Sequence, residues 1–229
     1  MHVPDGFLDL PTSAGTAVVA VAGISLALRG ARRELDDRLA PLAGVTAVFV
    51  FAGQMINFPV GAGTSGHLIG AALAALLVGP WTATLCLSVV LIVQALLFSD
   101  GGVTALGTNI TLMGIVAVWT AWGTYRLLSR LLPKRMSLVP WLAFVAGLVS
   151  VPAAAAEFAG LYAVGGQAPI ALDTLLTVMV GWHVVIGLGE GLITALIVGS
   201  VLAVRPDLVR AARPYLDERV LEIRETSAA

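Results

Sequence analysis

Seven apolar runs separated by short polar or glycine-rich segments are the most restrictive feature of this sequence. A transmembrane helix needs about 20 apolar residues, and the runs that reach or approach this length cover residues 11–29, 40–57, 65–79, 81–98, 108–128, 139–163 and 171–204. Only 12% of the residues are charged, about half the share in soluble proteins, so lipid must surround most of the chain. We predict an all-α, polytopic membrane bundle of seven transmembrane helices.

The third run, 65–79, is the shortest, and Gly79 and Pro80 separate it from the fourth. A re-entrant segment is therefore an alternative for this run. The lysines and arginines distinguish the two readings, because cytoplasmic loops collect these residues. All 13 fall in three clusters after the first, fifth and seventh runs: Arg29, Arg32, Arg33, Arg38; Arg126, Arg130, Lys134, Arg135; and Arg205, Arg210, Arg213, Arg219, Arg224.

Seven crossings place all three clusters on one side, whereas a re-entrant third run would put the first cluster opposite the others. The cation pattern therefore predicts an outward-facing N-terminus and a cytoplasmic C-terminus. We divide the chain into a membrane domain, 1–204, and a charged cytoplasmic tail, 205–229, which we expect to be an amphipathic or frayed helix. We expect the protein to be a multi-pass protein of a prokaryotic cell membrane.

The first residues do not resemble a signal peptide, because Asp5 and Asp9 precede the first apolar run and its arginines follow it. We expect this segment to be retained, with Met1 in place because the bulky His2 follows it. The single cysteine, Cys86, lies in an apolar run and is expected to pack as a small hydrophobe.

The Met1–His2 dipeptide is a candidate metal chelate. Its free amine, the amide nitrogen of His2 and the imidazole of His2 can bind one ion in a five-membered and then a six-membered ring. Three nitrogens in one plane suit Cu(II) and Ni(II), with Co(II) a further candidate, and leave one corner of the square open. Binding displaces protons and is expected to depend on pH.

The fourth ligand must come from elsewhere, and the chain has two other histidines, His67 and His183. His67 lies in the glycine-rich stretch "NFPVGAGTSGHLIG", which the topology places on the outer side. We prefer it, with Thr64 or Ser65 as the N-cap of the following helix. His183, within the last run, is left between a supporting role and simple packing.

Other polar residues are candidates for supporting the site or a metal pathway. Glu157 and Glu190 lie within apolar runs, where ionisable groups are costly and often functional, although a hydrogen-bonded tie between helices is the simpler interpretation. The outer loops carry only acidic fixed charges, which either attract cations or merely cap helices. Asn57, Asp100 or Asn109 are candidates for orienting a ligand histidine or the N-terminal segment.

Small residues recur four apart in two runs: Gly66, Gly70 and Ala74, then Gly187, Gly191, Ala195 and Gly199. Such stripes let helix backbones approach closely in lipid. Packing within this chain's own bundle is the preferred interpretation, and contact with another subunit is the alternative.

No Walker, HExxH or GxSxG motif is present, so ATPase, zinc protease and serine hydrolase functions have no motif to support them. The leading hypothesis is a non-catalytic, metal-capturing transport subunit. The alternatives are a stand-alone, proton-coupled secondary metal permease using Glu157 and Glu190, and a much weaker one, an intramembrane metalloenzyme built on His67, His183 and Glu190.

Several stretches resemble the CbiM/NikM family, the substrate-capture components of cobalt and nickel energy-coupling-factor transporters. They are "MHVPDGFLD", "INFPVGAGTSGHLIGA", "LLFSDGGVTALGTNITLMG", "GWHVVIGLGEGLITAL" and "VRPDLV". The resemblance covers nearly the whole chain. It implies seven membrane helices and a Co(II) or Ni(II) substrate held by the Met1 amine, the His2 amide and imidazole, and His67.

The resemblance also implies partners: a transmembrane coupling subunit, a cytoplasmic pair of ABC ATPases and, in many relatives, a small auxiliary membrane subunit. It links the protein to metal supply for processes such as cobalamin biosynthesis, with no organic cofactor and no nucleic acid. Some relatives have a histidine where this chain has Asp100, which weakens the case for a metal ligand in that loop.

Overall fold

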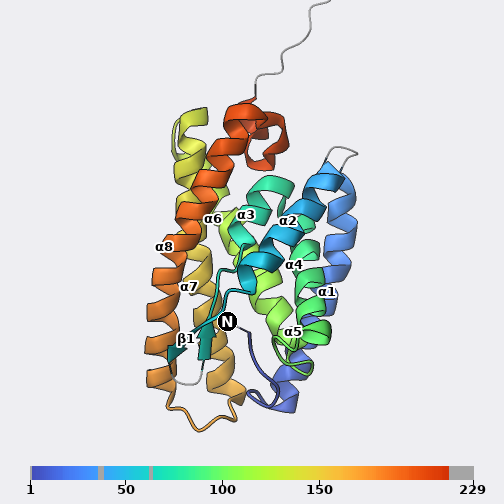
Figure 1. Cartoon of the computed structure of the whole chain (residues 1–229), viewed down its shortest axis with the longest axis vertical. Helices are drawn as coiled ribbons and strands as arrows, with labels where there is room; N and C mark the ends of the chain where they lie inside the picture. Colours follow the sequence, from blue (N-terminus) through green and yellow to red (C-terminus); the bar gives the residue numbers. More distant parts are fainter. Residues whose placement is uncertain (1, 36–38, 62–63, 217–229) are drawn as a thin grey trace, which may run out of the picture.

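The computed structural model describes residues 2–35, 39–61 and 64–216, and these form a bundle of helices with one small hairpin of strands (Figure 1). The longer helical segments are α1 (Leu10–Glu34), α4 (Pro80–Leu97), α7 (Val139–Gly165), α8 (Leu172–Val204) and a continuous stretch of α5 (Leu106–Asn109), the π-helix η1 (Ile110–Ala117) and α6 (Val118–Leu131). The shorter elements are α2 (Leu39–Gln54), α3 (Ala71–Val78), the 3₁₀ turns η2 (Met136–Leu138), η3 (Pro206–Leu208) and η4 (Arg210–Tyr215), and the antiparallel strands β1 (Phe58–Gly61) and β2 (Thr64–Gly66).

Among the described residues, five helical segments are long and apolar enough to cross a membrane, and α2 is a shorter apolar helix. Large apolar side chains also cover the outside of the bundle: Leu10, Val18 and Leu196 are each more than 60% exposed. A surface of this kind is stable in lipid rather than in water. The chain is a multi-pass membrane protein.

The third predicted run differs most from the structure. Strands β1 and β2 form the hairpin, and the helix that follows has only eight residues, about 12 Å of rise. Every residue of α3 is buried, so it is a core helix that packs inside the bundle. The predicted N-cap was wrong: Ser65 lies in β2, and Gly70, with a φ of +76°, precedes α3 without a side-chain cap of its own.

The bundle has two distinct ends (Figure 1). We call one the hairpin end, which carries β1, β2 and the loops 98–105 and 166–171. We call the other the arginine end, where α1, α6 and α8 finish and α7 begins. The described cations of all three clusters lie at or near the arginine end: Arg29, Arg32, Arg33, Arg126, Arg130, Lys134, Arg135, Arg205, Arg210 and Arg213.

Residues 205–216 do not extend the last helix. Pro206 and Pro214 are incompatible with a continuous α-helix, and the chain instead folds back as the 3₁₀ turns η3 and η4. Ala211 is buried there, and its carbonyl accepts a 2.9 Å hydrogen bond from the hydroxyl of Tyr125 on α6. The expected amphipathic or frayed helix is therefore a packed turn over this stretch, and residues 217–229 lie outside the described part.

The glycines of the last helix pack within this chain. A methyl group at Gly191 would lie 2.5 Å from the backbone oxygen of Phe144 on α7, and one at Gly187 would lie 2.8 Å from that of Leu148. The other stripe is not helical at its start, because Gly66 lies in β2 and Gly70 precedes α3. Close packing of α7 against α8 thus explains the second stripe.

Candidate metal-capture site

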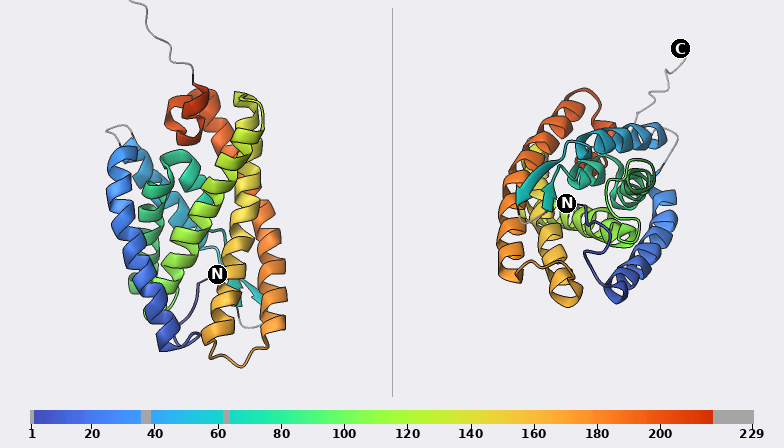
Figure 2. Two further views of the ribbon diagram at one scale, coloured as in Figure 1. Left: turned by 180° about the vertical axis from the view of Figure 1, so that it is seen from behind. Right: turned by 60° about the horizontal axis from the view of Figure 1, so that its bottom comes forward.

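The N-terminal segment enters the bundle at the hairpin end (Figure 1, dark blue). Asp9 caps α1 by accepting a 2.9 Å hydrogen bond from the backbone N–H of Thr12, which turns the preceding residues back toward the interior. The view of Figure 2 that brings this end forward shows the segment dipping toward the centre of the ring of helices. On one side it pairs with the α7–α8 connection, since Leu8 forms an antiparallel bridge with Gly166.

On its other side the segment is held by the loop 98–105 and by Asn109. The Asn109 amide accepts a hydrogen bond from Val3 N–H at 2.8 Å and donates one to Val3 C=O at 3.1 Å, as a neighbouring strand would. Gly102 N–H also donates to Val3 C=O, at 2.9 Å. A methyl group at Gly102 would lie 2.4 Å from the Asp5 nitrogen, so only glycine permits this approach.

Asp5 fastens the same loop. Its carboxylate accepts hydrogen bonds from both the backbone N–H and the hydroxyl of Thr104. These bonds, the side-chain one first, lower the pKa of Asp5 below its ordinary value. The N-terminal segment is thus fixed by main-chain and side-chain bonds on both sides, which gives His2 a defined place.

The imidazole of His2 has one satisfied nitrogen and one without a good hydrogen bond. Its Nε2 lies 3.2 Å from Oε1 of Gln94, a fully buried residue on α4. An amide oxygen only accepts, so Nε2 carries the proton and Nδ1 carries a lone pair in the neutral ring. Nδ1 is buried without a well-formed hydrogen bond, although Oδ1 of Asp100 lies 3.1 Å away.

Asp100 therefore points its charge at the His2 ring. Its other oxygen, Oδ2, accepts a 3.1 Å hydrogen bond from Asn57. Burial raises the pKa of Asp100, but the contacts with His2 and Asn57 outweigh it, and the net pKa lies below the ordinary value. The Asp100 carboxylate therefore places negative charge beside Nδ1 of His2, which favours a cation bound there.

His67 is fully buried after β2 and has the same half-satisfied pattern. Its Nδ1 donates a 2.8 Å hydrogen bond to the Leu68 carbonyl, which leaves the lone pair on Nε2, and that atom is buried without a partner. Full burial disfavours a charged ring, so the neutral imidazole, which can bind a metal, is the favoured form.

The structure brings His2 and His67 together although 65 positions separate them in sequence. Their rings stack with centroids 4.4 Å apart and planes inclined by 23°. Two buried lone pairs with no protein donor, each on a ring whose other nitrogen is fixed by a hydrogen bond, are the arrangement seen in histidine metal sites. No group of three or more His, Cys, Asp or Glu side chains suited to a metal occurs in the described part of the chain.

Glu190 holds the segment that follows His67. Its two carboxylate oxygens accept hydrogen bonds from the backbone N–H groups of Ile69, at 2.7 Å, and Gly70, at 3.1 Å. The Ile69 carbonyl accepts a third bond, 2.7 Å long, from the amide of Gln54 on α2. Glu190 thus replaces the missing N-cap of α3 and fixes the backbone two residues beyond His67.

The remaining predicted residues have less direct places. His183 is fully buried, donates from Nδ1 to the Met179 carbonyl at 2.7 Å, and keeps an unpartnered Nε2. It shares the buried face of α8 with Glu190, as the heptad spacing predicts. Ser65 pairs with Pro59 in the hairpin, and Glu157 lies apart on α7 with one unpartnered oxygen. Met1 lies outside the described residues.

Gln94 and Gln54 were missed by reasoning from the sequence. Both are uncharged amides within apolar runs, and a search for ionisable side chains in those runs does not find them. A buried side-chain amide has up to four hydrogen bonds to satisfy in lipid. An Asn or Gln in an apolar run is therefore, like an ionisable residue, a sign of a buried polar contact.

Comparison with known proteins places the chain in a family. The family model described as "Cobalt uptake substrate-specific transmembrane region" (CbiM) matches residues 2–208. A putative fused nickel transport protein, NikMN, of Archaeoglobus fulgidus is 39% identical over 91% of this chain and 68% of its own length. The cobalt transport protein CbiM of Sorangium cellulosum is 34% identical over 91% of this chain and 94% of its own.

A crystal structure of a truncated transition metal transporter has a similar fold, with a TM-score of 0.81 and 33% identity, over 89% of this chain and 99% of that one. The family model runs from the N-terminal segment to beyond the end of α8. The chain belongs to the CbiM family of cobalt and nickel transport proteins.

Proposed function

We propose that this chain is the substrate-capture component of an energy-coupling-factor transporter and binds one Co(II) or Ni(II) ion at the hairpin end. The ligands are the Met1 amine, the His2 amide, Nδ1 of His2 and Nε2 of His67. The observation that carries the proposal is the stacked pair of His2 and His67 rings, in which Nε2 of His67 is buried without a partner and Nδ1 of His2 faces only the Asp100 carboxylate. The two proposed ring donors are the nitrogens that do not bond to Gln94 or to the Leu68 carbonyl.

The surrounding residues have defined roles in this proposal. Gln94 fixes the proton of His2 on Nε2 and so keeps Nδ1 available. Asn109 and the loop 98–105 hold the N-terminal segment. Asn57 orients Asp100 through a hydrogen bond. The negative charge of Asp100 attracts the metal cation and partly neutralises the charge of the bound ion. Because the ligands include ionised main-chain nitrogen, a bound ion releases protons and its affinity rises with pH.

The membrane arrangement follows from the cations. We propose seven crossings, with the hairpin end outside and the arginine end in the cytoplasm, in a prokaryotic cell membrane. The buried α3 then serves as a crossing together with the hairpin that precedes it. Residues 205–229 form the cytoplasmic tail behind the membrane domain of residues 1–204.

Delivery inward requires other subunits in this proposal. A transmembrane coupling protein and a cytoplasmic ABC ATPase pair drive import, and a small auxiliary membrane subunit assists. The capture component itself is not an enzyme.

The test is to obstruct the N-terminus. A short Gly/Ser extension before Met1, His2→Ala and His67→Ala should each abolish stoichiometric Ni(II) or Co(II) binding, measured by calorimetry and elemental analysis on purified protein. The same extension placed after the last residue is the matched control and should leave binding intact. Full binding by the N-terminally extended protein would refute the chelate.

A stand-alone proton-coupled permease is less well supported. It requires Glu190 to exchange protons, but both its oxygens are engaged by the backbone N–H groups ahead of α3. Vesicles that contain this chain alone should therefore show no metal uptake when only a pH gradient is imposed.

A further inference from the structure

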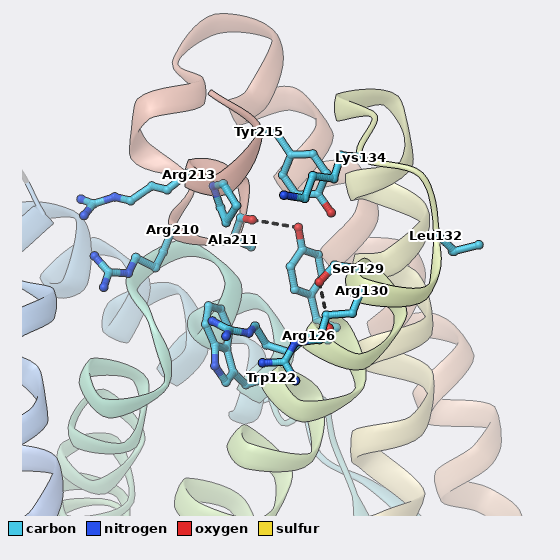
Figure 3. A pocket seen from close by; sticks show the side chains of 12 residues that line it. Trp122, Arg126, Ser129, Arg130, Leu132, Lys134, Arg210, Ala211, Arg213 and Tyr215 are labelled. Carbon is cyan, nitrogen blue, oxygen red and sulfur yellow. Dashed lines mark hydrogen bonds between the residues drawn. The ribbon is translucent and has the colours of Figure 1, made fainter. Parts of the chain in front are cut away.

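A large pocket lies at the arginine end, far from the metal site, between α6 and η4. Its volume is about 640 Å³. Helix α6 supplies Trp122, Tyr125, Arg126 and Arg130, and the hydrogen bond from Tyr125 to Ala211 fixes η4 as the opposite wall (Figure 3).

The pocket is strongly cationic. Five basic side chains line it, namely Arg126, Arg130, Lys134, Arg210 and Arg213, and its described lining contains no carboxylate. The Arg126 guanidinium lies 5.9 Å from the Trp122 ring centroid, a cation–π contact, and Figure 3 shows the two side chains next to each other. A concave site with this charge and aromatic lining is suited to a singly or doubly charged anion.

Its position indicates where the anion comes from. The pocket lies where α6 ends at Leu131, the level expected for lipid headgroups at the end of an apolar helix. Leu127 and Leu131 are one turn apart and are 58% and 72% exposed, on the face of α6 beside the one that carries Arg126 and Arg130. An exposed apolar surface therefore runs along the outside of α6 next to the cationic pocket, and lipid acyl chains can pack against it.

A second basic pocket at this end is a poorer candidate. It is smaller, about 400 Å³, and is lined by residues of α1, by Trp81 and by Arg210, which also lines the first pocket. Its lining includes the carboxylate of Glu34, which accepts hydrogen bonds from the N–H and hydroxyl of Thr82 at the start of α4. The charge there favours an anion less than in the pocket on α6.

We propose that the pocket between α6 and η4 binds the phosphodiester headgroup of an anionic phospholipid, whose acyl chains lie along Leu127 and Leu131. Arg126, Arg130 and Lys134 contact the phosphate, and Trp122 forms the floor. Basic pockets at the ends of membrane helices are typical sites for such lipids. This inference does not depend on metal binding, and its test reads no metal.

The test compares lipids and charges. The purified full-length protein in phosphatidylcholine nanodiscs should gain thermal stability when phosphatidylglycerol is added, and native mass spectrometry should show one retained phosphatidylglycerol. Arg126→Gln/Arg130→Gln should weaken retention roughly tenfold or more, because each cation at a membrane surface contributes several-fold to lipid binding. Both side chains are exposed, so folding is checked by an unchanged melting temperature in phosphatidylcholine alone.

Arg32→Gln/Arg135→Gln is the matched control, since it removes two exposed cations from the same end outside this pocket. It should retain the lipid as the wild type does. Equal losses in both double variants would show general surface charge and overturn the site. Equal stabilisation by glycerol 3-phosphate or inorganic phosphate would also overturn it, because the bound anion would then not be a membrane lipid.

Discussion

At the scale of single residues, the candidate site depends on which nitrogen of each imidazole carries its proton. In both His2 and His67 one ring nitrogen bonds to an amide or carbonyl oxygen, while the other faces only the Asp100 carboxylate in His2 and has no partner in His67. The bond to a fixed oxygen therefore decides which nitrogen can meet a metal. For His2 that oxygen belongs to Gln94, whose amide also lies 3.9 Å from the sulfur of Met55.

Gln94→Leu should weaken Ni(II) binding by roughly 10- to 100-fold, the usual cost of losing the hydrogen bond that orients a ligand histidine. Gln94→Glu keeps an acceptor at that position and should restore most of the affinity. Calorimetric titration of the purified protein measures both.

Ser88→Ala is the matched control, because Ser88 is also buried on α4 but donates only within its own helix, to the Thr84 carbonyl. Its affinity should equal that of the wild type. An unchanged Ni(II) affinity in Gln94→Leu would show that the His2 ring does not need this bond.

At the scale of elements, two buried glutamates perform the same task at two helix starts. Glu190 receives the N–H groups ahead of α3, and Glu34 receives the N–H and hydroxyl of Thr82 at α4. Neither helix has a side-chain cap of its own, and a glycine with positive φ precedes each one, Gly70 and Gly79. Of these two glutamates, only Glu190 holds a backbone segment next to a candidate metal ligand, His67.

This pairing gives a matched test. Glu190→Gln and Glu34→Gln each place an amide N–H₂ where an acceptor is needed, so each should lower the free energy of unfolding by about 1–3 kcal/mol. Only Glu190→Gln should also weaken metal binding, by roughly tenfold, because the backbone after His67 loses its anchor. Thermal unfolding and calorimetry separate the two effects.

Equal metal affinities in the two variants would mean that the position of His67 does not depend on Glu190. A loss of metal affinity in Glu34→Gln but not in Glu190→Gln would likewise show that Glu190 does not position His67.

The sequence predicted the long elements well and the irregular ones poorly. Runs such as 139–163 and 171–204 end within about two residues of α7 and α8, because a lipid-facing helix is apolar along its whole length. Hydropathy could not show that the run 65–79 begins in a strand and continues as a short core helix, because such segments are as apolar as a transmembrane helix. His2 and His67 were predictable from their residue types, whereas Gln94 and the cap formed by Glu190 depend on contacts between distant segments.

At the scale of the whole molecule, tight packing against α7 holds α8, the helix that carries Glu190 and His183, in place. A methyl group at Gly147 would lie 2.8 Å from Cα of Gly191, so the two backbones meet almost directly. In lipid such close van der Waals contact, rather than exclusion of water, holds helices together.

Gly191→Ala should therefore destabilise the bundle by about 1–3 kcal/mol, because the added methyl would lie 2.5 Å from the Phe144 oxygen. Gly189→Ala on the same helix meets nothing within 4 Å and should be neutral or stabilising by up to about 1 kcal/mol. Melting temperatures in detergent compare the two, and equal values would show that α7 and α8 are not held at this contact.

The way the N-terminal segment is anchored also orders the protein's biogenesis. Val3 bonds to Gly102 and Asn109, and Asp9 and Phe7 bond to Gly165 and Gln167. Gly102 and Asn109 are synthesised well after Val3, and Gly165 and Gln167 later still, so the bonds to Asp9 and Phe7 can form only once α7 has been synthesised. A truncated product that stops before α7 would therefore lack the bonds that fix the N-terminal segment at Phe7 and Asp9.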